Sequence, residues 1–252
     1  MNFTHTEVFN FAGAIRGARN PLESWGLSDS GICKGGDNGI GCENCSEQKN
    51  CKHTYDKEYK VGKADMRLLQ NLLKASIKET NSHSKFMRQI MVCVDITAPL
   101  YWWKEFSAYK VGTVENSEST MHKLTTTPIT LERFELDGFS HELTSAYTDE
   151  DYGTVFEVGD MVEGVIDWLE SLRKKYLETK DKRYWVELIR WLPESWLQTR
   201  TVTMNYQVLR QMYFDRRNHK LSLWSVDFVE WLKTLPYAKE LIMYEGEVTG
   251  NE

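Results

Sequence analysis

The sequence predicts an α+β fold, and two observations support that prediction. Apolar and polar residues alternate along residues 86–97, as they do in a strand with one buried face. Several other segments repeat apolar residues every three or four positions, which is typical of amphipathic helices. At 252 residues, 41% of them apolar, the chain is long enough to bury a core as one large domain or two small ones.

The first elements follow in order along the chain. Small and apolar residues over 8–27 predict a short helix or strand that stops at Asn20-Pro21, because proline disfavours helix in the residue before it. Residues 28–62 are rich in glycine and cysteine and lack apolar periodicity, which indicates an insertion. Leucines at helical spacing predict a helix over 64–80, which leads into the strand at 86–97.

Helices dominate the remainder of the predicted chain. Residues 125–158 are mixed and contain turn residues, so we expect them to cover the site from outside. Asp160 is the expected N-cap of the helix that follows. Helices are expected over 100–111, 160–177, 182–191, 204–214 and 222–235.

Charge and hydropathy exclude some classes of protein. The net charge of −6 and the pI of about 5.6 disfavour a nonspecific binder of nucleic acid or of a membrane surface. No apolar run approaches the roughly 20 residues that a membrane span needs. The first residues lack the basic start and apolar core of a signal peptide, and we expect a cytoplasmic protein.

Four of the five cysteines lie close together within the insertion. A Cys-x2-Cys pair with two more cysteines in a glycine-rich loop suits tetrahedral zinc, because such a loop can wrap four thiolates around one ion. The spacing is not that of a standard zinc ribbon, and an iron–sulfur cluster is the alternative. The predicted ligands are Cys33, Cys42, Cys45 and Cys51.

Residues 95–124 are the most informative segment. An apolar strand runs to Pro99, a short aromatic helix follows, and then comes a turn dense in hydroxyls and amides. This order resembles the signature of the flavin-dependent thymidylate synthases, the ThyX family: apolar strand, Ala-Pro, aromatic helix, then Arg-His-Arg-x-x-Ser-x-Asn-Glu-x-Ser-x-Arg. The matching stretch, 108–121, is one residue longer and has Ala108 and Met121 where the family has arginines.

The resemblance extends beyond the signature, in the same order along the chain. The segments 11–19, 83–90 and 189–193 are similar to the family's early arginine segment, its His-x-x-x-Phe segment and its Arg-x-x-Leu-Pro segment. Residues 205–216 follow its Asn-x-Arg-x-x-x-Asn-x-x-x-x-Arg helix. The resemblance implies a single domain over 1–252, with a central, mainly antiparallel sheet surrounded by helices, that assembles as a homotetramer.

The resemblance also implies roles for individual residues. Arg216 aligns with the arginine that binds the pyrimidine and favours its ionised form; a guanidinium can bond a carbonyl and N3 together. Alternatively, Arg216 only lies at a helix C-terminus, where cations are favoured. Likewise, the polar residues of the signature segment could form an ordinary exposed turn. The implied nucleotide-binding residues are Glu105, Ser117, Ser119, Arg190 and Arg216, and the implied flavin-binding residues are His83, Lys110, Asn116, Asn205 and Gln211.

The missing arginines matter for binding. Two lost charge-assisted phosphate contacts, each worth about 1.5–3 kcal/mol, would weaken a nucleotide by orders of magnitude unless other cations replace them. The nearby cations are Arg88, Lys104, Lys110, Lys123 and Arg190. Tyr101, Trp102 and Trp103 could stack on a ring system, although adjacent helix positions point in different directions, so at least one should belong to the core.

Two functions follow from the resemblance. The first is reductive methylation of dUMP, or a related pyrimidine nucleotide, in which methylene-tetrahydrofolate supplies the carbon, reduced FAD supplies reducing equivalents and NADPH recharges the flavin. The second is a ThyX-fold protein that has lost catalysis and binds a nucleotide or a partner protein. The missing arginines favour the second, whereas Arg216 and Asn205 favour the first.

Overall fold

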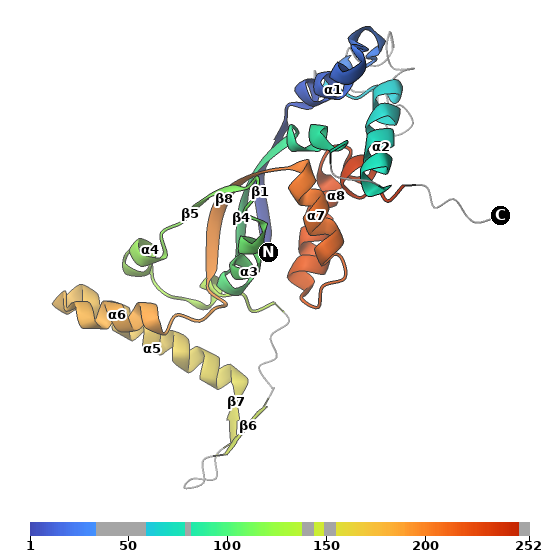
Figure 1. Cartoon of the computed structure of the whole chain (residues 1–252). Coiled ribbons are helices and arrows are strands. Elements are labelled where there is room, and N and C mark those ends of the chain that lie inside the picture. Colours follow the sequence, from blue (N-terminus) through green and yellow to red (C-terminus); the bar gives the residue numbers. More distant parts are fainter. Residues whose placement is uncertain (34–58, 79–81, 138–143, 149–154, 247–252) are drawn as a thin grey trace. The chain divides into compact units, whose positions relative to one another are not determined.

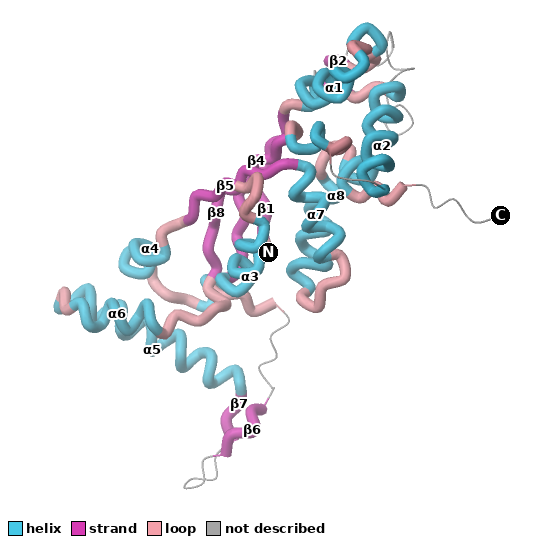
Figure 2. Tube along the Cα trace, in the orientation of Figure 1, coloured by secondary structure: helices cyan, strands magenta, loops and turns pink. Residues whose placement is uncertain are grey.

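The computed structural model describes residues 1–33, 59–78, 82–137, 144–148 and 155–246. Contacts between residues divide the chain into two compact units. Unit 1 consists of Met1–Asn2, Ile96–Ala108 and Asn116–Thr201, and unit 2 consists of Phe3–Asp95, Tyr109–Glu115 and Val202–Glu252. The mixture of helices and strands confirms the predicted α+β class (Figure 2).

Four strands form the main sheet, in the order β1-β4-β8-β5. Their bounds are Asn2–Phe9 for β1, Met91–Pro99 for β4, Val114–Ser117 for β5 and Leu197–Asn205 for β8 (Figure 1). The predicted strand at 86–97 is confirmed as β4, displaced toward the C-terminus. Ile90, Val92, Val94 and Ile96 are all buried, as the alternation requires.

The pairing of β4 with β8 is antiparallel, as predicted for the central sheet. At one end the backbone N–H of Leu100 donates to the carbonyl of Trp196 at 3.1 Å. At the other end the N–H of Tyr206 donates to the carbonyl of Ile90 at 3.0 Å. Residue numbers therefore rise along one strand while they fall along the other, which defines an antiparallel pair.

The helices of unit 2 include the predicted helices at 64–80 and 204–214. α7 begins at Tyr206 with Asn205 as its N-cap, two residues later than the predicted start, because Met204 and Asn205 still belong to β8. Two π-helical segments follow, at Leu223–Phe228 and Ala238–Ile242. The α-helices of this unit are α1 (Phe11–Arg19), α2 (Lys63–Lys78), α7 (Tyr206–Arg216) and α8 (Val229–Thr234), and β2 (Gly31–Ile32) pairs with β3 (Tyr59–Lys60).

Unit 1 contains a pair of packed helices, α5 and α6. The predicted N-cap of α5 was wrong: α5 begins at Val158 with Glu157 at the N-cap, and Asp160 lies in its first turn. A carboxylate in the first turn still favours the positive end of the helix dipole. The elements of this unit also include α3 (Leu100–Phe106), α4 (Thr120–Thr126), α5 (Val158–Thr179), α6 (Lys182–Arg190), β6 (Thr144–Thr148) and β7 (Val155–Glu157).

A buried ion pair joins α1 to the start of α2 in unit 2. Arg19 is 5% exposed and Asp65 is fully buried, and the Arg19 Nε donates to Asp65 Oδ1 at 2.6 Å. The second carboxylate oxygen accepts from the hydroxyls of Ser28 and Ser30, at 2.7 and 2.6 Å. Because both charges are paired and hydrogen-bonded, their burial is tolerated. The pair therefore fixes the segment before β2 against α2.

Within the described parts of the chain, no helix combines the length and the apolar character needed to cross a membrane.

Candidate functional site

Arg216 ends α7, and side chains from two other segments of unit 2 hold its guanidinium. Its Nε donates to the Tyr109 hydroxyl at 2.9 Å. The guanidinium carbon lies 5.6 Å from the centre of the Tyr109 ring and 4.9 Å from that of the Trp224 ring. These are cation–π distances. A long side chain that is clamped in this way loses little further freedom when it binds a ligand.

Tyr109 links Arg216 to the neighbouring carboxylate. The Tyr109 hydroxyl donates to Asp215 Oδ2 at 3.3 Å while it accepts from Arg216. Burial raises the pKa of Tyr109 above its ordinary value, and the hydrogen bond from Arg216 opposes that shift. The phenol therefore keeps its proton at neutral pH. Trp224, which supplies the second ring, is buried in the π-helical segment Leu223–Phe228, and such segments are frequent at functional sites.

Asn205, a predicted flavin contact, is buried at the start of α7. Its Oδ1 accepts from the N–H of Val208 at 3.0 Å, which caps the helix. Gly112, with φ of +82°, lies directly against it: a Cβ there would meet Asn205 Nδ2 at 2.7 Å. The next residue, Thr113, buries its hydroxyl without a hydrogen-bond partner among the described residues. An orphaned buried hydroxyl fits a site that a polar ligand completes.

The other predicted flavin residues of unit 2 are exposed. His83 lines a hollow of about 320 Å³ with residues of α1, α2 and the turn Lys85–Arg88. Gln211 is exposed on α7, and Lys110 is exposed beside Tyr109. Gln207, at the family's arginine position, accepts from the Ser84 hydroxyl at 2.9 Å. None of these contacts joins His83 or Gln211 to Arg216 directly.

Ser119 and its neighbours belong to unit 1, where they form a separate group. Ser119 is the N-cap of α4, and its Oγ lies 2.7 Å from His122 Nδ1. The side-chain amide of Gln198, on β8, donates to the carbonyl of Glu118 and to the Thr120 hydroxyl, each at 2.9 Å. The polar turn is thus held onto β8 rather than left as a loose loop.

The remaining predicted residues of unit 1 have different surroundings. Asn116 and Ser117 are exposed on β5, and Glu105 is half-buried on α3. Arg190 is exposed at the end of α6, where it pairs with Glu187 at 2.5 Å. This contact does not bring Arg190 to Ser119.

The aromatic helix α3 is largely core. Trp102 is fully buried and Trp103 is 1% exposed, and the Trp103 Nε1 donates to the carbonyls of Ala98 and Gln198. Tyr101 is half-buried and donates to Glu135 at 2.8 Å. The expectation that at least one of the three belongs to the core is confirmed, and both tryptophans do.

The cations proposed to replace the lost arginines fall into two classes. Lys104 pairs with Glu194 at 2.6 Å, Lys123 pairs with Glu118 at 2.9 Å, and Arg190 is paired as described above. Arg88 and Lys110 form no ion pair with a described residue, and both are exposed in unit 2. Ala108 and Met121, which occupy the arginine positions, are also exposed.

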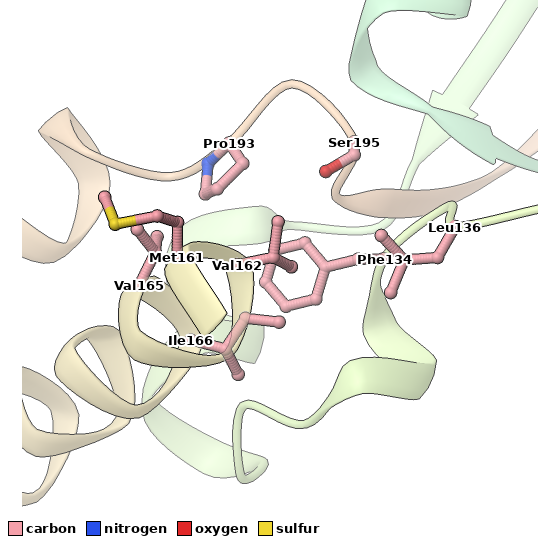
Figure 3. A pocket seen from close by; sticks show the side chains of 8 residues that line it. All are labelled: Phe134, Leu136, Met161, Val162, Val165, Ile166, Pro193 and Ser195. Carbon is pink, nitrogen blue, oxygen red and sulfur yellow. The ribbon is translucent and has the colours of Figure 1, made fainter. Parts of the chain in front are cut away.

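An apolar hollow of about 250 Å³ lies in unit 1, beside α5 (Figure 3). Phe134, Val162 and Ile166 point into it, and Met161 forms part of its edge. Ser195 is the polar member of the labelled lining. Because its lining is almost entirely apolar, the hollow suits an apolar group rather than a phosphate. No predicted nucleotide or flavin residue lines it.

The predicted metal site lies mostly outside the described residues. Cys33 is half-buried just after β2, whereas Cys42, Cys45 and Cys51 are not described. Among the residues that are described, no group of three or more histidine, cysteine or acidic side chains is arranged to hold a metal ion. The zinc or iron–sulfur site therefore stays a prediction.

Sequence reasoning identified Arg216 but missed what surrounds it. Tyr109 is 107 residues from Arg216 along the chain, and nothing in its local sequence marks it as a partner. Within the predicted helix at 222–235, Trp224, Phe228 and Trp231 follow helical spacing as an apolar stripe, and all three are buried. The contact between the Trp224 ring and the Arg216 guanidinium could be recognised only from the three-dimensional structure.

The fold and these side chains together define an α+β protein with an antiparallel sheet and an arginine clamped between aromatic rings. Two solved structures of the flavin-dependent thymidylate synthase ThyX from Helicobacter pylori, each in complex with FAD and dUMP, share the fold with a TM-score of 0.57. Their sequences are 14% and 16% identical to this chain. Each superposition covers 96% of this chain, together with 98% of the first H. pylori chain and 97% of the second. No protein-family model and no curated protein sequence matches the chain. The chain therefore has the ThyX fold with a strongly divergent sequence.

Proposed function

We propose that this chain is a flavin-dependent thymidylate synthase-like enzyme that methylates dUMP or a related pyrimidine nucleotide. The observation that carries the proposal is the clamped guanidinium of Arg216, which is held by the Tyr109 hydroxyl and the Trp224 ring. It occupies the position where the resemblance implies the pyrimidine-binding arginine. The shared fold supports it, since both H. pylori structures hold FAD and dUMP.

Arg216 would bind the pyrimidine ring. A guanidinium stays charged at any working pH and can donate to a ring carbonyl and to a deprotonated N3 at once. A fixed positive charge beside N3 favours the ionised ring, and an ionised pyrimidine is more electron-rich at carbon. The contacts from Tyr109 and Trp224 hold the plane of the guanidinium before the ligand arrives, which is the purpose of preorganisation.

Tyr109 would keep this charge in place. Its hydroxyl accepts from Arg216 and donates to Asp215, so the phenol must stay protonated to serve both neighbours. The raised pKa of Tyr109 is consistent with that requirement. We assign Tyr109 a positioning role because its hydroxyl acts through Arg216.

Lys110 and Arg88 are the best replacements for the missing phosphate-binding arginines. Both lack an ion-pair partner among the described residues, whereas Lys104, Lys123 and Arg190 are engaged with carboxylates. Recruiting an engaged cation costs its existing pair, so the two unengaged cations are favoured. Glu105, Ser117 and Ser119 remain proposed nucleotide contacts on the resemblance alone.

The residues present suit a flavin in part. The buried hydroxyl of Thr113 offers a polar contact that no described residue satisfies, next to the close contact of Gly112 with Asn205. His83, Lys110, Asn116, Asn205 and Gln211 are the residues proposed to hold the cofactor. When bound and reduced, FAD would supply the reducing equivalents for the methylation. We expect the enzyme to act as a homo-oligomer.

A second candidate function is nucleotide binding without catalysis. The apolar, exposed side chains of Ala108 and Met121 favour it, because they stand where the family has charged phosphate or cofactor contacts. Such a protein would keep the Arg216 site and lose the flavin.

The test is turnover by the full chain. Purified protein is incubated with dUMP, methylene-tetrahydrofolate, FAD and NADPH, and dTMP is measured by chromatography, with Arg216→Ala as the inactive variant and Arg217→Ala as the matched control. We expect dTMP from the wild type and from Arg217→Ala. In parallel, quenching of flavin fluorescence should show FAD binding in the micromolar range, about −8 kcal/mol.

The outcomes separate the two functions. Binding of dUMP without FAD binding or dTMP formation supports the noncatalytic protein. An absence of binding to both dUMP and FAD rejects both candidates.

A further inference from the structure

A polar hollow of about 480 Å³ lies in unit 2 along one face of α2. It is separate in residue composition from the Arg216 site, with which it shares no lining residue. Its volume is in the range of pockets that hold small organic ligands. Met66 and Tyr244 contribute its apolar surface, and every lining residue except Tyr244 belongs to α2.

Three cations share this face of α2. Lys63, Arg67 and Lys74 are four and seven residues apart, spacings that return to the same side of a helix. They therefore lie about 6 Å and about 10 Å apart along the helix axis, within reach of one extended anion. The hollow has no acidic lining residue.

Two of these three cations have no ion-pair partner among the described residues. Arg67 and Lys74 form no ion pair with a described residue. The single acidic residue of α2, Asp65, is buried and bound to Arg19. In a chain with 37 acidic and 31 basic residues, an exposed face that gathers cations alone is unexpected, because acidic residues are the more numerous.

The lining also contains groups that suit a nucleotide. Gln70 and Asn71 lie between the cations and carry amide N–H donors, and the Gln70 amide already reaches the carbonyl of Glu240 at 3.4 Å. Tyr244 is half-buried and offers an aromatic ring at the edge of the cationic face. Aromatic rings that stack on bases, beside cations that hold phosphates, form a common combination for nucleotides.

We propose that this face of α2 binds the di- or triphosphate chain of a nucleoside phosphate, with Arg67 and Lys74 on the phosphates and Tyr244 against the base. The site would be a second anion site, additional to the one at Arg216. Because its ligand carries several charges, binding should weaken as the salt concentration rises.

The test is calorimetric titration of the full chain with two probes, inorganic tripolyphosphate and ATP. The double variant Arg67→Gln, Lys74→Gln should bind both probes at least about tenfold more weakly than the wild type. The matched control, Arg16→Gln with Lys220→Gln, removes two exposed cations of unit 2 that do not line the hollow, and should bind as the wild type does. Circular dichroism verifies that both double variants fold.

Two further variants define the ligand and the site. Tyr244→Leu should weaken the binding of ATP but not of tripolyphosphate. If the wild type binds both probes equally and Tyr244→Leu changes neither affinity, the site recognises only the phosphate chain, and the role of Tyr244 against the base is wrong. Arg216→Ala should leave both affinities unchanged, which keeps this result independent of the proposed pyrimidine site. Failure of the wild type to bind either probe, or an equal loss in the two double variants, overturns the proposal.

Discussion

Replacing Asp65 with alanine should destabilise the chain strongly. The substitution removes a fully buried carboxylate that accepts from the Arg19 Nε and from the hydroxyls of Ser28 and Ser30. Arg19 would keep its contacts with the carbonyls of Ser24 and Leu27 but lose its counter-charge while it remains buried. Breaking a buried ion pair from one side costs about 3–5 kcal/mol.

Urea unfolding followed by tryptophan fluorescence measures this effect. The urea concentration at the unfolding midpoint should be lower for Asp65→Ala than for the wild type. The expected decrease is about 3–5 kcal/mol divided by the slope of the unfolding free energy against urea concentration. The double variant Arg19→Met, Asp65→Leu should recover a large part of that loss, because it leaves no unpaired charge in the interior. A loss below about 1 kcal/mol, the range of an exposed pair, would refute the account of this network.

Three other predictions concern acid, backbone and metal. Burial alone would raise the pKa of Asp65, but hydrogen bonds from Ser30, Ser28 and Arg19 outweigh burial and lower that pKa. The stability that this carboxylate provides is therefore present above about pH 4 and is lost as the pH falls through the pKa of the folded state. The difference in unfolding free energy between the wild type and Asp65→Asn should shrink in acid, and a difference that is constant with pH would contradict this. Gly112→Ala should cost about 1–2 kcal/mol from the positive φ alone, with more from the clash against Asn205 Nδ2, while Gly26→Ala, where a Cβ meets nothing within 4 Å, provides the control in the same urea assay. Elemental analysis should find one zinc, or iron from a cluster, per chain in the wild type and in Cys93→Ala, and less in Cys33→Ala; wild-type protein with neither metal would remove the predicted site.

The elements that the sequence predicted well are those with a strong apolar period. The core face of β4 and the leucines of α2 could be placed from spacing alone, because their burial is what the spacing encodes. The edge strand β5 could not: all four of its residues are exposed, so it carries no apolar alternation and resembles a polar turn. β8 was also missed, since one of its buried positions is the polar Gln198.

The candidate site was predictable one residue at a time and not as a constellation. Arg216 was identified by resemblance, and Asn205 by the same helix motif. Their neighbours depend on long-range packing: Tyr109 reaches Arg216 across 107 positions, and Gly112 meets Asn205 across a similar separation. No periodicity within a helix or strand encodes such a contact.

Calorimetric titration of dUMP into the wild type, Arg216→Ala and Arg217→Ala tests the central claim most directly. Arg217 is a suitable control because it is the adjacent arginine and has its own partners, the carboxylate of Glu245 and the rings of Tyr213 and Phe214. The Arg216 site predicts that Arg216→Ala weakens dUMP by about 10- to 150-fold, the equivalent of about 1.5–3 kcal/mol, while Arg217→Ala binds nearly as the wild type does. Equal affinities in the two variants, or no binding of dUMP by the wild type, would contradict the assignment of Arg216 to a pyrimidine.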